Sequence, residues 1–317
     1  MESDFDDPEI DRAGPLEPQP APSLDLLGPL AEATTAVQVR AALTTQAIIG
    51  DEQGCSVPKV LAVNVGDQVR ITRNSSEYAL YTVSEKRKSD NPNLVRLGLD
   101  ARLRLGTSAE FSASLATPVV AAANLTDAQA EAAGELVERL VDDGVENGLV
   151  VIAPHGGAIE INTDLQAATV ATALASSSWI CKGWKVGGGA YERWHITSTK
   201  ISPASFPKLA QIANRGFAYG VAFHGMSSGG VLIGGAAPLE LKQMVKTAII
   251  EAIGDATISV TVASPTDLYN ADSPSNVVNW LTAGGLGGLQ IEQDRTVRTL
   301  YWQAVCNAVI DVFAQLI

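Results

Sequence analysis

The sequence contains few of the residues that mark several classes of protein. Its three cysteines, Cys55, Cys181 and Cys306, are odd in number and far apart, so we expect no disulfide framework and no cysteine-based zinc motif. Each is expected to be a small buried apolar residue. Aromatic residues make up only 5% of the chain, which has 28 glycines. This composition favours an α/β protein, with helices packed closely on a sheet, over an aromatic-rich β-sandwich.

Positive charge is scarce as well. The chain carries 22 Lys and Arg against 35 Asp and Glu, and the resulting net charge of −13 argues against a nucleic-acid-binding protein. One stretch, residues 180–215, is the exception, with a net charge of +5 from Lys182, Lys185, Arg193, Lys200, Lys208 and Arg215 against Glu192. This stretch is either an ordinary solvated face or a cationic mouth for an anionic substrate.

Long apolar runs and targeting signals are also missing. The chain has no run of about 18 apolar residues, so we expect no membrane span and no membrane partner. Its acidic beginning has no basic region before an apolar core, so we expect no signal peptide. These absences predict a protein that acts in the cytoplasm or is released without a signal peptide.

The composition divides the chain into three parts. Residues 1–50 are predicted to be a disordered acidic tail and a linker, because the first 23 residues are acidic and rich in proline. Within that part, residues 24–50 are richer in Leu and Ala and favour a short helix or a loosely docked linker. Residues 51–118 alternate with a period of two between turn residues, which predicts a small β-barrel. Residues 119–317 alternate strands with helices, which is typical of an α/β domain with a mixed or mostly parallel sheet.

Several elements of the third part can be placed from the sequence. Residues 124–148 predict a helix that starts with a capping box of Thr126 and Gln129. "LVVIAP" (149–154) is typical of a strand buried on both faces. Further strands are expected near 178–184, 193–198, 219–225, 231–235, 257–263 and 288–293, and helices near 161–176, 203–215, 238–253, 275–283 and 295–316.

The chain has only three histidines, and two of them occupy equivalent positions. His155 closes the strand "VVIAP" and His224 closes "YGVAF", and each is followed by glycine. Ligands bind at the carboxyl ends of strands in open α/β sheets, so both imidazoles can face one point. Glu160 follows His155 by five residues and needs a loop to fold back to the same point. A zinc site of three such ligands is one interpretation. Two buried histidines bonded to carbonyls, with Glu160 as the charge at a helix start, is the other.

Two further polar residues lie on expected strands. His195, in "RWHITST", is either a fourth polar group of the same pocket or a histidine of the core. Glu292 shares one face of "GLQIEQ" with Gln290, while Ile291 faces the other way. A glutamate beside a glutamine on a late strand favours a role in chemistry, and a polar stripe on an exposed edge strand is the alternative.

Five motifs in order resemble the poly-γ-glutamate hydrolase family, best known from bacteriophages. They are "APHGGAIE" (153–160), "WHITST" (194–199), "VAFHG" (221–225), "VLIGG" (231–235) and "GLQIEQDRTVR" (288–298), and the resemblance covers residues of about 120–317. It implies a mixed-sheet, three-layer fold like that of zinc carboxypeptidases, preceded here by the barrel. It makes residues 119–317 a zinc-dependent hydrolase domain.

The resemblance also assigns roles. It implies that His155, Glu160 and His224 bind Zn²⁺ and that Glu292 is the general base. Here Gln293-Asp294-Arg295 replaces the apolar residue and Ser-Arg that often follow this glutamate in the family, which changes the expected substrate pocket. His195 or Arg193 is then expected to stabilise the oxyanion or to bind a carboxylate. Arg295 and Arg298 lie one helical turn apart, and Arg298 is expected to clamp a substrate carboxylate with two hydrogen bonds.

The predicted activity is hydrolysis of γ-glutamyl amide bonds in an anionic polymer or a peptide-like substrate. Two alternatives stay open at this point. One is a zinc amidase, peptidase or deacylase that acts on another substrate. The other is a non-catalytic binding or structural protein that keeps the fold.

Overall fold

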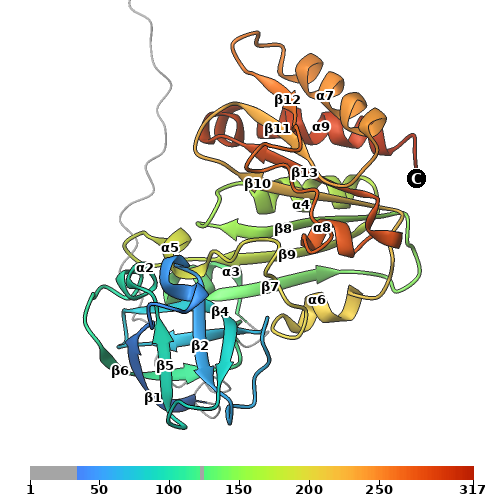
Figure 1. Ribbon diagram of the computed structural model, residues 1–317. Helices are drawn as coiled ribbons and strands as arrows, with labels where there is room; N and C mark the ends of the chain where they lie inside the picture. Colours follow the sequence, from blue (N-terminus) through green and yellow to red (C-terminus); the bar gives the residue numbers. More distant parts are fainter. Residues whose placement is uncertain (1–33, 122–124) are drawn as a thin grey trace, which may run out of the picture.

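The computed structural model describes residues 34–121 and 125–317, which form a barrel followed by a sheet flanked by helices (Figure 1). The predicted fold class is confirmed. The predicted disordered segment, residues 1–23, lies outside the described residues. Within them, no helix is both long and apolar enough to cross a bilayer.

The barrel is closed and has the strand order β1-β5-β2-β4-β3-β6. Its strands are β1 (Thr34–Ala41), β2 (Gly54–Pro58), β3 (Gln68–Thr72), β4 (Tyr78–Arg87), β5 (Leu94–Leu97) and β6 (Phe111–Ala116), and two short helices, η2 (Ala47–Gly50) and α2 (Leu99–Leu103), lie between them. Alternate apolar side chains, among them Val37, Val39, Val69 and Ile71, fill its interior.

The barrel begins earlier than the sequence predicted. β1 lies within the stretch assigned to the tail and linker, and it pairs with both β5 and β6 to close the barrel. The boundary at residue 50 was therefore wrong. The alanines and leucines around it favoured a helix, whereas the alternation of buried Val37 and Val39 with exposed neighbours is that of a strand.

The second part is built on a mixed sheet of seven strands in the order β12-β11-β13-β10-β8-β9-β7. Its strands are β7 (Leu136–Val141), β8 (Leu149–Gly157), β9 (Ser177–Gly183), β10 (Tyr219–Gly225), β11 (Val231–Gly234), β12 (Val260–Val262) and β13 (Gly288–Gln293). The central strands β13, β10, β8 and β9 are parallel, so their carboxyl ends lie at one edge.

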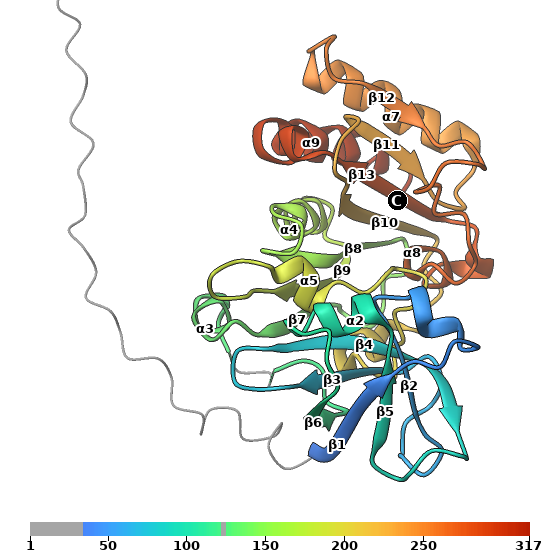
Figure 2. The same cartoon turned by 60° about the vertical axis from the view of Figure 1, so that its left-hand side comes forward.

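Helices cover both faces of this sheet and give three layers (Figure 2). α4 (Thr163–Ala173), α7 (Leu239–Ile253) and α9 (Trp302–Phe313) pack on one face. α5 (Ala190–Trp194), α6 (Pro207–Ile212) and α8 (Val277–Trp280) pack on the other face, where Tyr78 and Leu80 of the barrel join the same core. The remaining elements are α3 (Asp127–Ala133), η3 (Ala283–Gly285) and the π-helical turn η4 (Val297–Tyr301).

Two expected elements differ from those observed. The helix predicted over 124–148 is only α3, which has the expected capping box of Thr126 and Gln129 but ends at Gly134 in the left-handed conformation (φ 67°). The chain then forms β7, the edge strand of the sheet. The strand predicted at 193–198 is instead the end of α5 followed by an irregular segment. That segment crosses the site.

Candidate metal centre

A cleft of about 610 Å³ opens where the parallel strands β8, β10 and β13 end. Residues from the sheet, from the loops after it and from the barrel line it. The polar lining includes Glu52, Gln53, His155, Glu160, His195, Ser198, His224, Asn276, Gln290, Glu292 and Arg298. The cleft thus brings together all but two of the site residues predicted from the sequence.

A bulge in β8 aims His155 into the cleft. Strict alternation would place His155 on the face of Ala153, which packs toward α4 and α9. The register with β9 shifts between Ala153 and Gly156, and the extra residue moves His155 to the opposite face. There its Nε2 lies 2.9 Å from the carbonyl oxygen of Ile196.

His224 and Glu292 lie side by side at the ends of neighbouring strands. β10 and β13 run in parallel with His224 opposite Glu292. Gln290, on the same face of β13, donates from Nε2 to Oε1 of Glu292 at 2.7 Å, and Asn276 donates to Gln290 Oε1 at 2.9 Å. This chain of amides fixes the carboxylate of Glu292. Burial raises the pKa of Glu292, which makes its carboxylate a stronger base.

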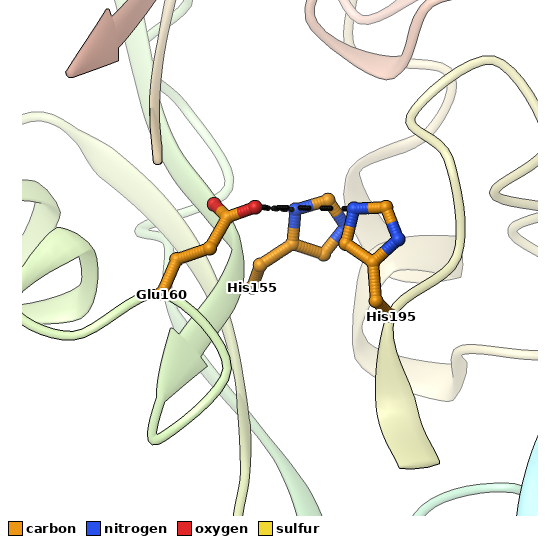
Figure 3. A group of neighbouring side chains, drawn as sticks. All are labelled: His155, Glu160 and His195. Carbon is orange, nitrogen blue, oxygen red and sulfur yellow. Dashed lines mark ion pairs between the residues drawn. The ribbon is translucent and has the colours of Figure 1, made fainter. Parts of the chain in front are cut away.

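The turn after β8 returns Glu160 to the two histidines, as its spacing from His155 requires. The backbone N–H of Glu160 donates to the His155 carbonyl at 2.9 Å, and Gly157 has a φ of 69° that only glycine adopts at low cost. The N–H of Gly225 donates to Glu160 Oε2 at 2.9 Å and orients the carboxylate. Figure 3 shows this carboxylate pointing at the rings of His155 and His195.

The donor atoms of His155, Glu160 and His224 converge. Nδ1 of His155 lies 3.2 Å from Glu160 Oε1 and 3.2 Å from Nδ1 of His224. Nδ1 of His224 lies 3.5 Å from Glu160 Oε2. Burial alone would raise the pKa of Glu160, but the two imidazoles lower it well below its ordinary value. Two ring nitrogens and a carboxylate at such spacing form the kind of ligand set that zinc takes in proteins.

The Nε2 atoms of His155 and His224 support the interpretation of these residues as metal ligands. Nε2 of His155 donates to the Ile196 carbonyl, which leaves Nδ1 with a lone pair and no proton in the neutral ring. Nε2 of His224 lies 3.3 Å from Ser198 Oγ. Metal-binding histidines use their other nitrogen in the same way. The Nδ1 lone pair of His155 faces Nδ1 of His224 beside a carboxylate, so the residues present fit a divalent metal.

His195 reaches the same place from the irregular segment after α5. Its Nε2 lies 3.8 Å from Glu160 Oε1, its ring contacts that of His155 with centroids 4.2 Å apart, and Tyr191 stacks on it at 4.3 Å. Potential ligand atoms of His155, Glu160 and His195 lie within 4.8 Å of one another. Burial lowers the pKa of His195 to about 2, so the ring is neutral. Two histidines, His195 and His224, therefore compete for the place of the third ligand.

Of the three arginines predicted to bind substrate, the structure places one in the cleft. Arg298, in the π-helical turn η4, donates from Nε to the Gln293 carbonyl at 3.2 Å and from Nη1 to the Ile161 carbonyl at 3.1 Å. Two of its nitrogens already bind backbone carbonyls, and the two-bond clamp expected from the sequence stays a prediction. Nη2 makes no hydrogen bond to any described residue and lies beside Gly225, where a Cβ would approach it to 2.9 Å.

The other two arginines do not line the cleft. Arg193 is buried against the barrel, with its guanidinium 3.7 Å from the Tyr78 ring centroid and hydrogen bonds to the carbonyls of Gly134 and Ser76. Arg295, at the helix start, is exposed and is not part of the cleft lining. None of the cations of residues 180–215 lines the cleft within the described chain, so the interpretation of that stretch as a cationic mouth was wrong.

Sequence reasoning missed the contribution of the barrel. Glu52 and Gln53, just before β2, line the cleft, and Gln53 hydrogen-bonds His195. No local signal marks them, because they meet the site only through contacts across 142 residues of sequence. Ser198, in the motif WHITST, and Asn276 were also missed, and they meet His224 and Gln290 across 26 and 14 residues of sequence.

Comparison with known protein families shows to which family this chain belongs. The sequence profile of the family described as "Poly-gamma-glutamate hydrolase" matches residues 123–308, more than half of the chain. The chain belongs to this hydrolase family. The predicted resemblance is confirmed, and the match spans His155, Glu160, His224 and Glu292, whereas the barrel lies outside it.

Solved structures of low identity are similar to parts of the chain, and no curated protein is significantly similar to it. A bacteriophage poly-gamma-glutamate hydrolase is 20% identical, covering 56% of this chain and 88% of its own with a TM-score of 0.43. "YNDL-apo (Zinc-free)" is 19% identical, covering 56% and 89% with a TM-score of 0.44. A metallo-carboxypeptidase from Burkholderia cenocepacia is 10% identical, covering 80% and 82% with a TM-score of 0.36.

Proposed function

We propose that this protein is a zinc-dependent hydrolase that cleaves γ-glutamyl amide bonds. The observation that carries the proposal is the convergence of His155 Nδ1, His224 Nδ1 and the Glu160 carboxylate at one end of the cleft. Membership of the poly-γ-glutamate hydrolase family supports the choice of bond. These three side chains would hold the zinc, with a position left for water or substrate.

A zinc ion bound there would supply Lewis-acid chemistry, acidifying water and polarising a carbonyl. Glu292 then takes the proton from the attacking water and gives it to the leaving amine. Its carboxylate is suited to both steps, because burial raises its pKa and Gln290 holds one oxygen. The other oxygen is left to face the water.

Arg298 gives the cleft a way to recognise glutamyl units. A γ-linked glutamate keeps a free α-carboxylate beside the scissile amide, and Nη2 of Arg298 faces the cleft next to Gly225. One charge-assisted hydrogen bond from Nη2 would hold that carboxylate. The described acids of the lining, Glu52, Glu160 and Glu292, outnumber this arginine. The site therefore suits one bound carboxylate close to the metal better than a long row of them.

The proposed function is tested with the zinc-loaded protein and three substrates: γ-linked polyglutamate, α-linked polyglutamate and an N-acyl amine. Size-exclusion chromatography measures chain length and a colour assay measures released amine. We expect shortening of the γ-linked polymer alone. Cleavage only of the acyl amine would make the protein a deacylase, and cleavage of none would contradict a hydrolytic role in this substrate class.

The role of Glu292 is tested by Glu292→Gln. We expect the variant to keep its zinc and to lose about 10²–10⁴-fold in kcat, because the amide cannot take up the proton. Glu240→Gln, which changes an exposed glutamate of α7, is the control and should turn over like the wild type. Loss of zinc from Glu292→Gln would instead make Glu292 a metal ligand.

A further inference from the structure

The segment that carries His195 is held by the barrel as well as by its own domain. Arg104, on the barrel, donates to the carbonyls of Glu192 at 2.6 Å and of His195 at 3.4 Å. Further along, Lys200 pairs with Asp51 at 2.6 Å, and Gln68 Nε2 donates to the Lys200 carbonyl at 2.7 Å. The same segment supplies the Ile196 carbonyl to His155 and Ser198 Oγ to His224. The barrel therefore helps to fix the position of a segment that lines the cleft.

Gln53 also contacts this segment, and its hydrogen bonds determine which way its side-chain amide is oriented. Its Oε1 accepts the backbone N–H of Thr197 at 2.8 Å and the Thr197 hydroxyl at 3.0 Å. A backbone N–H is always a donor, so the atom that faces it must be the oxygen. The NH₂ group then faces the other way, where Nε2 lies 3.0 Å from Nδ1 of His195. Gln53 is 6% exposed, so water has little access to these bonds.

This orientation determines the tautomer of His195. The amide nitrogen of Gln53 can only donate, so Nδ1 of His195 must accept and carries no proton. A neutral imidazole has one N–H, which is then on Nε2. That nitrogen points into the cleft, 3.8 Å from Glu160 Oε1, and makes no hydrogen bond to any described residue. Tyr191 stacks on the ring and keeps its plane.

We infer that Gln53 of the barrel is a positioning residue that holds His195 with its proton on Nε2, so that His195 donates a hydrogen bond to the substrate and does not bind the metal. A nitrogen that carries a proton has no lone pair for a cation, so the third ligand is His224. The acceptor is the oxygen of the scissile carbonyl, on which negative charge develops. This last step rests on the proposed hydrolytic function, whereas the tautomer does not.

The test uses the zinc-loaded, full-length protein labelled with ¹⁵N-histidine. Only three imidazoles contribute signals, and His195→Gln identifies that of His195. Long-range ¹H–¹⁵N spectra distinguish a protonated, a bare and a metal-bound nitrogen. We expect Nε2 of His195 to be protonated and Nδ1 to be bare. A metal-bound Nε2, or a proton on Nδ1, would overturn the inference.

Gln53→Glu replaces the NH₂ donor that faces His195 with a carboxylate oxygen, which can only accept a hydrogen bond. The carboxylate still accepts from Thr197 but can no longer donate to His195, so the proton should move to Nδ1. Gln68→Glu is the matched control, because Gln68 is a buried barrel glutamine that binds the same segment without touching His195. It should keep the wild-type tautomer. An unchanged His195 signal in Gln53→Glu would overturn the inference, and circular dichroism and zinc content establish that each variant is folded and loaded.

Kinetics separate this inference from the proposed function. If γ-linked polyglutamate is cleaved, Gln53→Glu should lose about 10²–10³-fold in kcat with KM little changed, as for the loss of one oxyanion donor. An equal loss in Gln68→Glu would mean that Gln53 only joins the two domains, and it would overturn the positioning role. If the wild type cleaves none of the substrates, the proposed function fails, while the spectra still decide whether Gln53 sets the tautomer.

Discussion

Gly225 is the residue at which one added methyl group would reach Arg298, the arginine that we propose binds substrate. A Cβ built there would lie 2.6 Å from Cζ of Arg298, and something would have to move. We expect Gly225→Ala to displace the guanidinium, raise KM and lower kcat/KM about 10–100-fold, which corresponds to one lost hydrogen bond to a charged group. Zinc content should stay unchanged. Gly50→Ala is the control, since nothing lies within 4 Å of a Cβ at that position. An unchanged KM in Gly225→Ala would remove Arg298 from the substrate site.

At this scale the sequence predicts residues that end strands and misses residues brought in from elsewhere. His155, His224 and Glu292 were placed correctly in the cleft because the ends of parallel strands meet at one edge. Arg193 was misplaced, because its neighbours in sequence do not reveal that Tyr78 of the barrel covers it. The sequence around Gln53 did not mark it as a site residue either, because it meets His195 only in the folded protein.

At the scale of elements, helix signals extended past the true end of α3. Leu136, Leu140 and Val145 continue an apolar stripe with helical spacing, yet Gly134 ends the helix and β7 pairs with β9. Tertiary pairing overrode local propensity here. By contrast, the capping box and the strands 219–225 and 288–293 were predicted with their observed bounds, because Thr126 and Gln129 mark the cap and glycines mark the ends of the strands.

The capping box at the start of α3 has a measurable contribution. Thr126 Oγ1 accepts the N–H of Gln129 at 3.2 Å, and Gln129 Oε1 accepts the N–H of Thr126 at 2.9 Å. Thr126→Ala should lower the free energy of unfolding by about 1 kcal/mol, measured by urea denaturation. Thr126→Ser keeps the acceptor and should stay close to the wild type. Equal losses in the two variants would show that the methyl group, not the cap, provides the stability.

At the scale of the whole molecule, the barrel and the hydrolase domain share an interface that the sequence did not reveal. Arg70 of β3 forms a two-bonded pair with Glu135 at 2.7 and 3.0 Å, and both side chains are buried. The order of the two parts along the chain could be predicted from their different periodicities. Their contact depends on side chains that meet only after both parts have folded.

This buried pair gives the interface a clear test. Glu135→Leu should destabilise the protein by about 3–5 kcal/mol, because it leaves the Arg70 charge buried without a partner. Adding Arg70→Met in the double variant should recover most of that loss, since it removes the uncompensated charge. Urea denaturation measures both. A double variant no more stable than Glu135→Leu would show that lost packing, rather than the unpaired charge, causes the effect.

The central claim concerns the identity of the metal ligands, and zinc content per chain tests it most directly. Elemental analysis of wild type, His224→Ala and His195→Gln, each purified and dialysed alike, compares the two histidines that reach Glu160. The account predicts about one zinc per chain in the wild type and in His195→Gln, and almost none in His224→Ala. Equal zinc in the wild type and His224→Ala, or its loss from His195→Gln alone, would contradict it.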